Sequence, residues 1–271
     1  MKFSFKQFLY IFGILISIFY LLPVYTLINV SLKSNEDLIF GPVVPPRQIY
    51  FGAYQEAWMQ MSDYFLNSVA MTLPATIIST LLGSLSGYAF FRFKSKIVNF
   101  LFLLVVTGFY VPPQAILIPL IRFISSIGLY GTIHGLILTH IAYGMPITTL
   151  LFRNYYESIP KDILDSSEID GAGEWLKFVK IIFPLSLPGM AVVLTFQFTN
   201  IWNDFLFGLV LSQGRFSQPV TVAIANLKGT TLAAWNVQMA GAAIGAIPVV
   251  IFYIFGTKLI IKGLTAGAIK A

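Results

Sequence analysis

Cysteine is absent from this chain, and charged residues are scarce. With no cysteine among 271 residues, disulfide bonds, thiolate nucleophiles and thiolate metal sites are excluded. Only 10% of the residues are charged whereas 57% are hydrophobic, which is far more apolar than the core of a soluble domain requires. The chain also lacks a Gly-x-x-x-x-Gly-Lys-Ser/Thr phosphate loop, so it does not bind ATP in the usual way. These absences indicate an integral membrane protein without an ATPase site of its own.

Apolar segments long enough to cross a bilayer recur along the chain and predict an all-α, polytopic membrane protein. Each crossing needs about 20 mostly apolar residues. The first segment is too long for a signal-peptide core, and no cleavage site follows it, so we expect a retained helix. No internal repeat or linker divides residues 1–271, which therefore predict one transmembrane domain. We place six spans at about residues 8–30, 64–91, 98–121, 131–152, 183–211 and 237–261.

The third predicted span contains Val111-Pro112-Pro113. Proline lacks a backbone donor and clashes with the preceding helical turn, so the helix must kink or break at this point. We expect a helix end here, followed by a short helix at the outer surface that reaches about Ser126.

The basic residues gather at one side of the predicted spans. If both termini are cytoplasmic, twelve of the seventeen Lys and Arg residues lie inside, and the outside receives Lys33, Arg47, Arg122, Arg215 and Lys228. This bias predicts a multi-pass protein of the cell membrane with both termini in the cytoplasm. The net charge of +6 does not indicate nucleic-acid binding, because the basic residues flank apolar segments instead of clustering with aromatic residues.

A polar insert at about residues 158–182 interrupts the apolar pattern between the fourth and fifth spans. Six of the eleven acidic residues lie in or beside it: Glu157, Asp162, Asp165, Glu168, Asp170 and Glu174. Pro160 suits the first turn of a helix, and Asp162 complements the positive helix start. We predict a helix from Pro160 to about Ile169, ended by the flexible or left-handed backbone of Gly171 and Gly173.

The spacing within this insert predicts which residues face a partner. Ile163, Leu164 and Ser167 are expected to share one side of the first helix, opposite a polar side with Asp165. The small Ser166 and Ser167 would let the helix seat closely in a groove of another protein. A second helix would present an apolar stripe of Trp175, Phe178, Val179 and Ile182. An ordinary solvated loop helix is the alternative.

Polar residues near the end of the fifth span are the second candidate site. Asp204 is the only acid within or at the edge of a predicted span, and a carboxylate in a bilayer must be paired, protonated or face water. With it we group Gln197, Asn200, Trp202 and Asn203 as lining the translocation path or outer gate, with Trp202 stacking on a solute ring. Alternatively, Asp204 only caps or pairs at the helix end.

Two further patterns favour structural roles. His134 and His140 are six residues apart, on different helix faces with no acid nearby in sequence, so no metal site is expected. The pairs Gly83-x-x-x-Gly87 and Gly241-x-x-x-Gly245 are typical of close helix contacts.

The insert resembles the cytoplasmic signature of the membrane subunits of binding-protein-dependent ABC importers, Glu-Ala-Ala, two residues, Asp-Gly, about nine residues, Ile-x-Leu-Pro. The matching residues are Asp165-Ser166-Ser167, Asp170-Gly171, Ile181, Phe183 and Pro184. The departures, Asp for Glu, Ser for Ala and Phe for Leu, keep size and charge. Further strings are similar to the maltose-type carbohydrate permeases: Phe65-Leu-Asn-Ser68, Tyr88-Ala-Phe-Phe-Arg92-Phe-Lys94, Ile118-Pro-Leu120, Trp202-Asn-Asp-Phe-Leu206 and Gly263-Leu-Thr-Ala-Gly-Ala268.

This resemblance implies a permease subunit of an ATP-driven sugar importer. Its expected partners are a second homologous permease subunit, two ATP-binding subunits that hold the ATP, an extracytoplasmic sugar-binding protein and the sugar. It also implies that the insert is a coupling helix, with ATPase contacts by Pro160, Ile163, Leu164, Asp165, Ser166, Ser167, Asp170 and Gly171.

Three other functions compete with this interpretation. A secondary transporter would need coupling-ion ligands or titratable groups at mid-membrane, and carboxylates are absent from the middle of the predicted spans. A membrane-embedded hydrolase would need a nucleophile and a base at matching depth, and no such pair is suggested. An ABC importer permease for a non-sugar solute differs only at the outer and terminal motifs.

Overall fold

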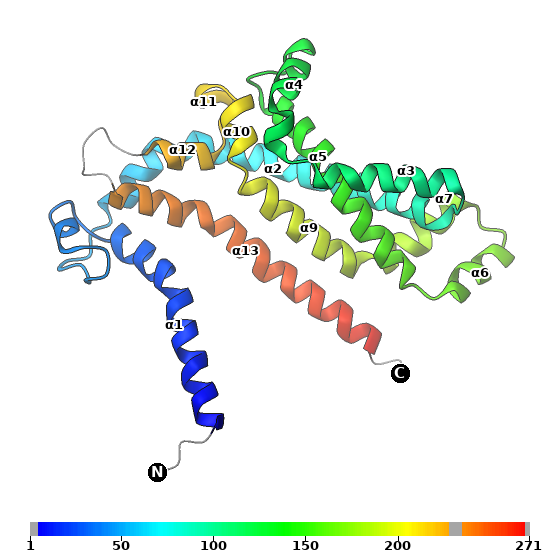
Figure 1. Ribbon diagram of the computed structural model, residues 1–271, viewed down its shortest axis with the longest axis horizontal. Coiled ribbons are helices and arrows are strands. Elements are labelled where there is room, and N and C mark those ends of the chain that lie inside the picture. The colour runs from blue at the N-terminus through cyan, green and yellow to red at the C-terminus, as the bar shows by residue number, and fades with distance from the viewer. Residues whose placement is uncertain (1–4, 228–234, 269–271) are drawn as a thin grey trace. The chain divides into compact units, whose positions relative to one another are not determined.

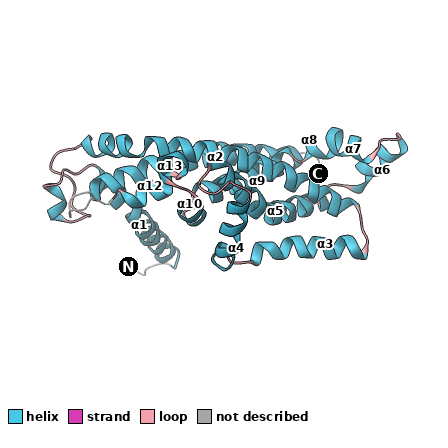
Figure 2. Cartoon of the chain, turned by 90° about the horizontal axis from the view of Figure 1, so that it is seen from above, coloured by secondary structure: helices cyan, strands magenta, loops and turns pink. Residues whose placement is uncertain are grey.

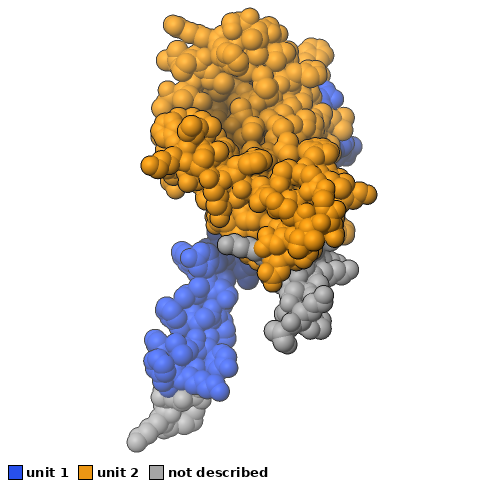
Figure 3. Space-filling model, turned by 90° about the vertical axis from the view of Figure 1, so that its right-hand side faces the viewer, with its two compact units in different colours: residues 1–63, 222–247 blue, residues 64–221, 248–271 orange. Residues whose placement is uncertain are grey.

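Helices and no strands make up the part of the chain that the computed structural model describes, residues 5–227 and 235–268 (Figures 1 and 2). The chain divides into two compact units, residues 1–63 with 222–247 and residues 64–221 with 248–271 (Figure 3). Among the described residues, four helices are long and apolar enough to cross a membrane, or up to six if two bent helix pairs each count as one span. The fold is therefore that of an all-α, multi-pass membrane protein.

The first unit begins with α1 (Phe5–Ser31), whose apolar part is entirely exposed, as expected of a helix that faces lipid. Polar side chains in the last turn of α1 and just after it are satisfied by backbone oxygens. Asn29 donates to the carbonyls of Pro42 and Val44, and the buried Lys33 ammonium donates to the carbonyl of Gly41. The short helix η1 (Asp37–Phe40) lies in the loop that follows α1.

The second unit is built on α2 (Gly52–Arg92), α3 (Lys96–Thr107), α5 (Ile133–Glu157) and α9 (Leu187–Trp202). Small residues bring these helices close together. A Cβ atom on Gly83 would collide with Thr148, and one on Gly87 would lie 2.8 Å from Cβ of Phe152. In the first unit, a Cβ on Gly241 or Gly245 would meet Leu227 or Ile224. Both glycine pairs thus serve close helix contacts, as predicted.

The predicted break in the third apolar segment is confirmed. After α3 comes η2 (Gly108–Tyr110), and α4 (Pro113–Ser126) then departs at 101° (Figure 2). Pro112 is extended at φ −61° and ψ 131°, and Pro113 opens α4, where a missing N–H costs no hydrogen bond.

Other predicted bounds need correction. The helix expected at 183–211 is broken twice: α8 (Phe183–Leu185) meets α9 across a bend of 75°, and Asn203–Phe205 separate α9 from α10 (Leu206–Leu211). The segment expected at 64–91 begins instead at Gly52, because residues 52–63 are helical and continue into it without a break. Beyond α10 lie α11 (Gly214–Ser217), α12 (Val220–Asn226) and α13 (Trp235–Ala268).

Candidate functional site

The acidic insert forms a capped helix at one end of the second unit (Figure 1). Helix α6 (Lys161–Ile169) begins after the extended Pro160 and ends at Gly171, whose φ of +77° lies in the left-handed region. Gly171 N–H donates to the Glu168 carbonyl and Ala172 N–H to the Ser167 carbonyl, both at 3.0 Å. This is the Schellman arrangement, which satisfies two carbonyls at the helix end and favours glycine at this position. The predicted stop at Gly171 is confirmed.

Helix α6 has an inner and an outer face. Leu164 and Ser167 are each 6% exposed and face the core of this unit. The outer, exposed side carries Asp165, Ser166, Asp170, Gly171 and Ile163. The grouping of Ile163 with Leu164 was wrong. Adjacent residues differ by about 100° around a helix, and the side of α6 that contacts the core is too narrow to include both. Four polar or small residues therefore remain available to a partner.

A four-residue charge network ties the insert to the end of α2. Nε of Arg92 donates to both carboxylate oxygens of Glu174 at 3.0 Å, and its Nη2 donates to Glu168 at 2.9 Å. The buried ammonium of Lys177 contacts the same two carboxylates at 3.2 Å each. The network balances two positive against two negative charges. Arg92 thus bridges two carboxylates through charge-assisted hydrogen bonds, which are stronger than those between neutral groups.

Glu174 is the residue whose titration this network changes most. Its hydrogen bond with Arg92 lowers the pKa of the carboxyl from 4.5 to about 2, and further bonds from Tyr88 and Lys177 act in the same direction. Glu174 opens α7 (Glu174–Lys177), outside the apolar helices, where a negative charge also suits the helix start. At neutral pH the link to α2 is therefore fully ionised.

A cluster of aromatic side chains packs against the inner face of α6. Leu164 enters a core that contains Tyr88, Phe152, Tyr156 and Phe178. The predicted apolar stripe is only half correct, since Phe178 and Ile182 are buried while Trp175 and Val179 are exposed. The reason is that η3 (Phe178–Ile182) winds as a π-helix, whose wider turn aligns residues differently from the 3.6-residue period.

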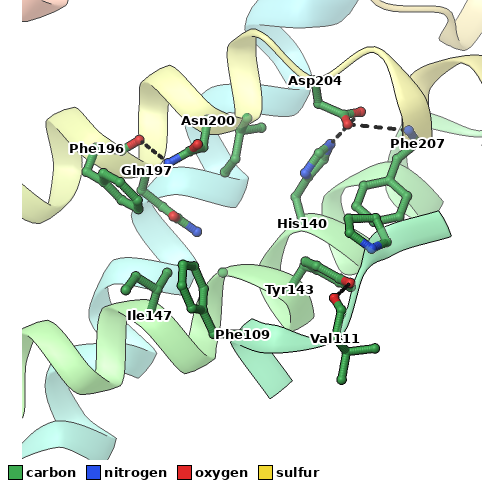
Figure 4. A pocket seen from close by; sticks show the side chains of 13 residues that line it. Phe109, Val111, His140, Tyr143, Ile147, Phe196, Gln197, Asn200, Asp204 and Phe207 are labelled. Atoms are coloured by element: carbon green, nitrogen blue, oxygen red, sulfur yellow. Dashed lines mark hydrogen bonds and ion pairs between the residues drawn. The ribbon is translucent and has the colours of Figure 1, made fainter. Parts of the chain in front are cut away.

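A second candidate site is a cavity of about 350 Å³ between α5, α9, η2 and α10 (Figure 4). Gln197, Asn200 and Asp204, which the sequence analysis grouped together, all line this cavity. Gln197 donates to Oγ of Ser79 at 3.1 Å, and Asn200 donates to the Phe196 carbonyl at 3.0 Å. The volume falls in the range of about 300–1,000 Å³ that small-molecule sites occupy.

Two predicted members of this site lie elsewhere. Trp202 is 2% exposed and its indole packs between Phe65 and Phe198, so it does not stack on a solute in this structure. Asn203 is exposed at the end of α9 and does not line the cavity. Successive residues lie about 100° apart around a helix, so the residues at 200–204 cannot all face one cavity.

His140 lines the cavity, although the sequence analysis assigned it only a structural role. Its imidazole is buried, and Nε2 lies 3.6 Å from Oδ2 of Asp204 (Figure 4). Asp204 also caps α10 by accepting from the Gly208 N–H at 3.0 Å. The two residues are far apart in the chain, so local spacing gave no sign of the pair. The available signal was that a carboxylate at this depth needs a partner.

Residues 79–265 match the family described as binding-protein-dependent transport system inner membrane component. This chain belongs to that family. The match includes both α6 and the cavity, so both sites lie within the part that defines these transport components.

Relatives within the family are similar over nearly their full length. A probable ABC transporter permease protein of Pyrococcus horikoshii is 46% identical, covering 97% of this chain and 96% of its own length. A xylose/arabinose import permease protein of Haloferax volcanii is 35% identical over 92% of this chain and 89% of its own. An osmoprotective compounds uptake permease protein of Synechocystis is also 35% identical, over 94% and 89%.

A solved structure shares the fold of this permease. One chain of a bacterial ABC transporter involved in the import of the acidic polysaccharide alginate aligns with a TM-score of 0.80, covering 95% of this chain and 99% of that one. The sequences are 19% identical, so the likeness establishes the common helical architecture.

Proposed function

We propose that this permease is a membrane subunit of an ATP-driven, binding-protein-dependent sugar importer, coupled to its ATPase through α6. The observation that carries the proposal is the capped, acidic α6, exposed on one face and clamped to α2 on the other, in a chain with no phosphate loop. Family membership and relatives named for sugar import support the same conclusion.

The outer face of α6 is suited to a groove on an ATP-binding subunit. Asp165 offers a negative charge that sets register, Ser166 lets the helix approach closely, and Ile163 adds a small apolar contact. Asp170 and Gly171 form the exposed end of the same surface. Pro160 begins it, whereas Leu164 and Ser167 face the permease and hold α6 to its own subunit. ATP is held by the partner, and this chain needs no cofactor.

Movement of α6 would reach the membrane helices by two routes. The network of Arg92, Glu168, Glu174 and Lys177 links it to the last turn of α2. Leu164 inserts it among the aromatic side chains of α2 and α5. Because both routes end on packed helices, α6 acts as a rigid lever when the ATPases close, provided that the ATPase holds it differently in its two states.

The assembly implied is a pair of permeases with two ATP-binding subunits and an extracytoplasmic sugar-binding protein. The distribution of basic residues supports a protein of the cell membrane in which α6 and both termini face the cytoplasm. Gln197, Asn200 and Asp204 line this subunit's share of the translocation path. An osmoprotective compound is the second candidate solute, because the Synechocystis relative is named for the uptake of such compounds.

Uptake into liposomes tests the proposal against a secondary transporter. The chain is reconstituted with candidate second-permease, ATPase and binding-protein partners, and uptake of labelled xylose, arabinose, glucose and raffinose is followed. With the binding protein outside the liposomes and ATP enclosed within them, ATP should drive uptake of at least one sugar without an ion gradient. Uptake that depends on an ion gradient and is unchanged by ATP would contradict the proposal of an ATP-driven importer.

A further inference from the structure

The cavity on α5 and α9 contains polar groups whose hydrogen-bonding capacity the protein does not use up. Asn200 donates one amide N–H to the Phe196 carbonyl, which leaves its second N–H as a donor and its amide oxygen as an acceptor. The hydroxyl of Tyr143 donates to the Val111 carbonyl at 2.6 Å and keeps its oxygen lone pairs. Both residues line the cavity (Figure 4).

His140 is the least satisfied of these groups. Its side chain is 6% exposed, and Nε2 has no hydrogen-bond partner among the described residues. The 3.6 Å to Asp204 exceeds a hydrogen bond, and Nε2 is shielded from solvent, so one hydroxyl oxygen contacts both side chains only after the His140 ring or Asp204 turns toward the cavity. A buried polar atom without a partner is costly, so the arrangement favours a ligand that supplies one.

The walls around these groups are aromatic. Phe109, Phe196 and Phe207 line the cavity, and Phe207 meets the His140 ring edge-on at a centroid distance of 5.7 Å. Apolar faces combined with a few hydroxyl-binding groups suit a sugar ring, which has apolar C–H faces and a polar rim.

The charge of the cavity restricts the ligand further. Among the described residues that line the cavity, Asp204 is the only acid and none is Lys or Arg. An acidic sugar would bring a second negative charge beside Asp204 with no cation to balance it. A neutral sugar meets no such penalty.

We propose that this cavity binds one ring of a neutral sugar during passage, with a hydroxyl shared by His140 and Asp204 and another held by Asn200. The inference rests on the proposed function and deepens it, since it makes this subunit a direct contact of the substrate. Uronic acids, which are sugars with a carboxylate, are excluded by the same cavity.

Cysteine labelling tests the site directly because the chain has no cysteine of its own. In the complete transporter, with partner cysteines replaced, Asn200→Cys is labelled with a water-soluble methanethiosulfonate. Asn203→Cys, exposed three residues further on and outside the cavity, is the matched control. The probe is the sugar that stimulates ATP hydrolysis through the binding protein.

Because Asn200→Cys removes one proposed contact, the sugar is used at ten times the Kd measured for this variant. We expect it to slow labelling of Asn200→Cys about tenfold, because the site is then empty about one-tenth of the time. Labelling of Asn203→Cys stays unchanged, and glucuronate protects neither variant. Equal labelling of Asn200→Cys with and without sugar would overturn the site, as would equal protection by glucuronate.

A histidine pair on the same helix supplies a second measurement. His140→Gln should reduce sugar uptake at saturating binding protein, whereas His134→Gln, exposed and outside the cavity, should not. Equal uptake by both variants would contradict a role for His140. ATP hydrolysis by the wild-type transporter is measured before any labelling. If no sugar-loaded binding protein stimulates this hydrolysis, the proposed function itself fails.

Discussion

Replacement of Gly171 isolates the energy stored in the cap of α6. A Cβ atom built on Gly171 meets no atom within 4 Å, so Gly171→Ala introduces no collision. Its whole cost comes from φ of +77°, which disfavours an L-residue by about 1–2 kcal/mol. Gly173 also has open space, but its φ of −68° is ordinary, so Gly173→Ala is a control without this cost.

The expected result is a loosened end of α6. Hydrogen exchange of a peptide covering residues 161–172 should rise about fivefold or more in Gly171→Ala, since 1 kcal/mol is about a fivefold change in an opening equilibrium at 25 °C. Gly171→Asn should recover part of the loss because asparagine tolerates the left-handed region. Gly173→Ala should exchange like the wild type.

The transport assay then separates the cap from the docking surface. If ATP-driven uptake falls in Gly171→Ala and recovers in Gly171→Asn, the cap geometry is what coupling needs. Exchange in Gly171→Ala equal to that in the wild type and in Gly173→Ala would refute the reasoning from backbone strain.

Three further predictions follow from contacts in the second unit. Arg92→Glu should reduce ATP-driven uptake, and combining it with Glu174→Arg should restore part of the uptake. In a double-mutant cycle of thermal unfolding, this partly exposed charge pair should show a coupling energy of about 1 kcal/mol. Strictly additive effects of the two changes would contradict the pairing of Arg92 with Glu174. Because the pKa of Glu174 is lowered from 4.5 to about 2, its contribution to stability is complete above 4.5 and lost as pH falls toward 2, so acid unfolding of Glu174→Gln should be less pH-dependent in that window. Gly83→Ala should lower the midpoint of thermal unfolding by forcing α2 from Thr148, at a cost of about 1–3 kcal/mol, whereas Gly13→Ala, with open space, should not.

Features determined by neighbouring residues were predictable from sequence. The end of α6 at Gly171 and the break at Pro112 follow from backbone rules that act within a few residues. The small-residue contact of Gly83 was likewise predictable, because spacing alone puts such residues on one helix face.

Features that join distant segments were not predictable. Arg92 and Glu174 are 82 residues apart, and nothing in either local sequence marks them as partners. His140 and Asp204 meet only because α5 and α9 pack together. The burial of Trp202 depends on Phe65 of another helix, so its direction could not be read from the polar run around it.

The most direct test of the central claim is ATP hydrolysis by the assembled transporter in liposomes, with and without sugar-loaded binding protein. The account predicts stimulation in the wild type, its loss in Asp165→Lys on the outer face of α6, and its retention in Glu36→Lys, an exposed site with the same change of charge. Equal stimulation in all three proteins, or failure of any ATPase to purify with the wild-type chain, would contradict coupling through α6.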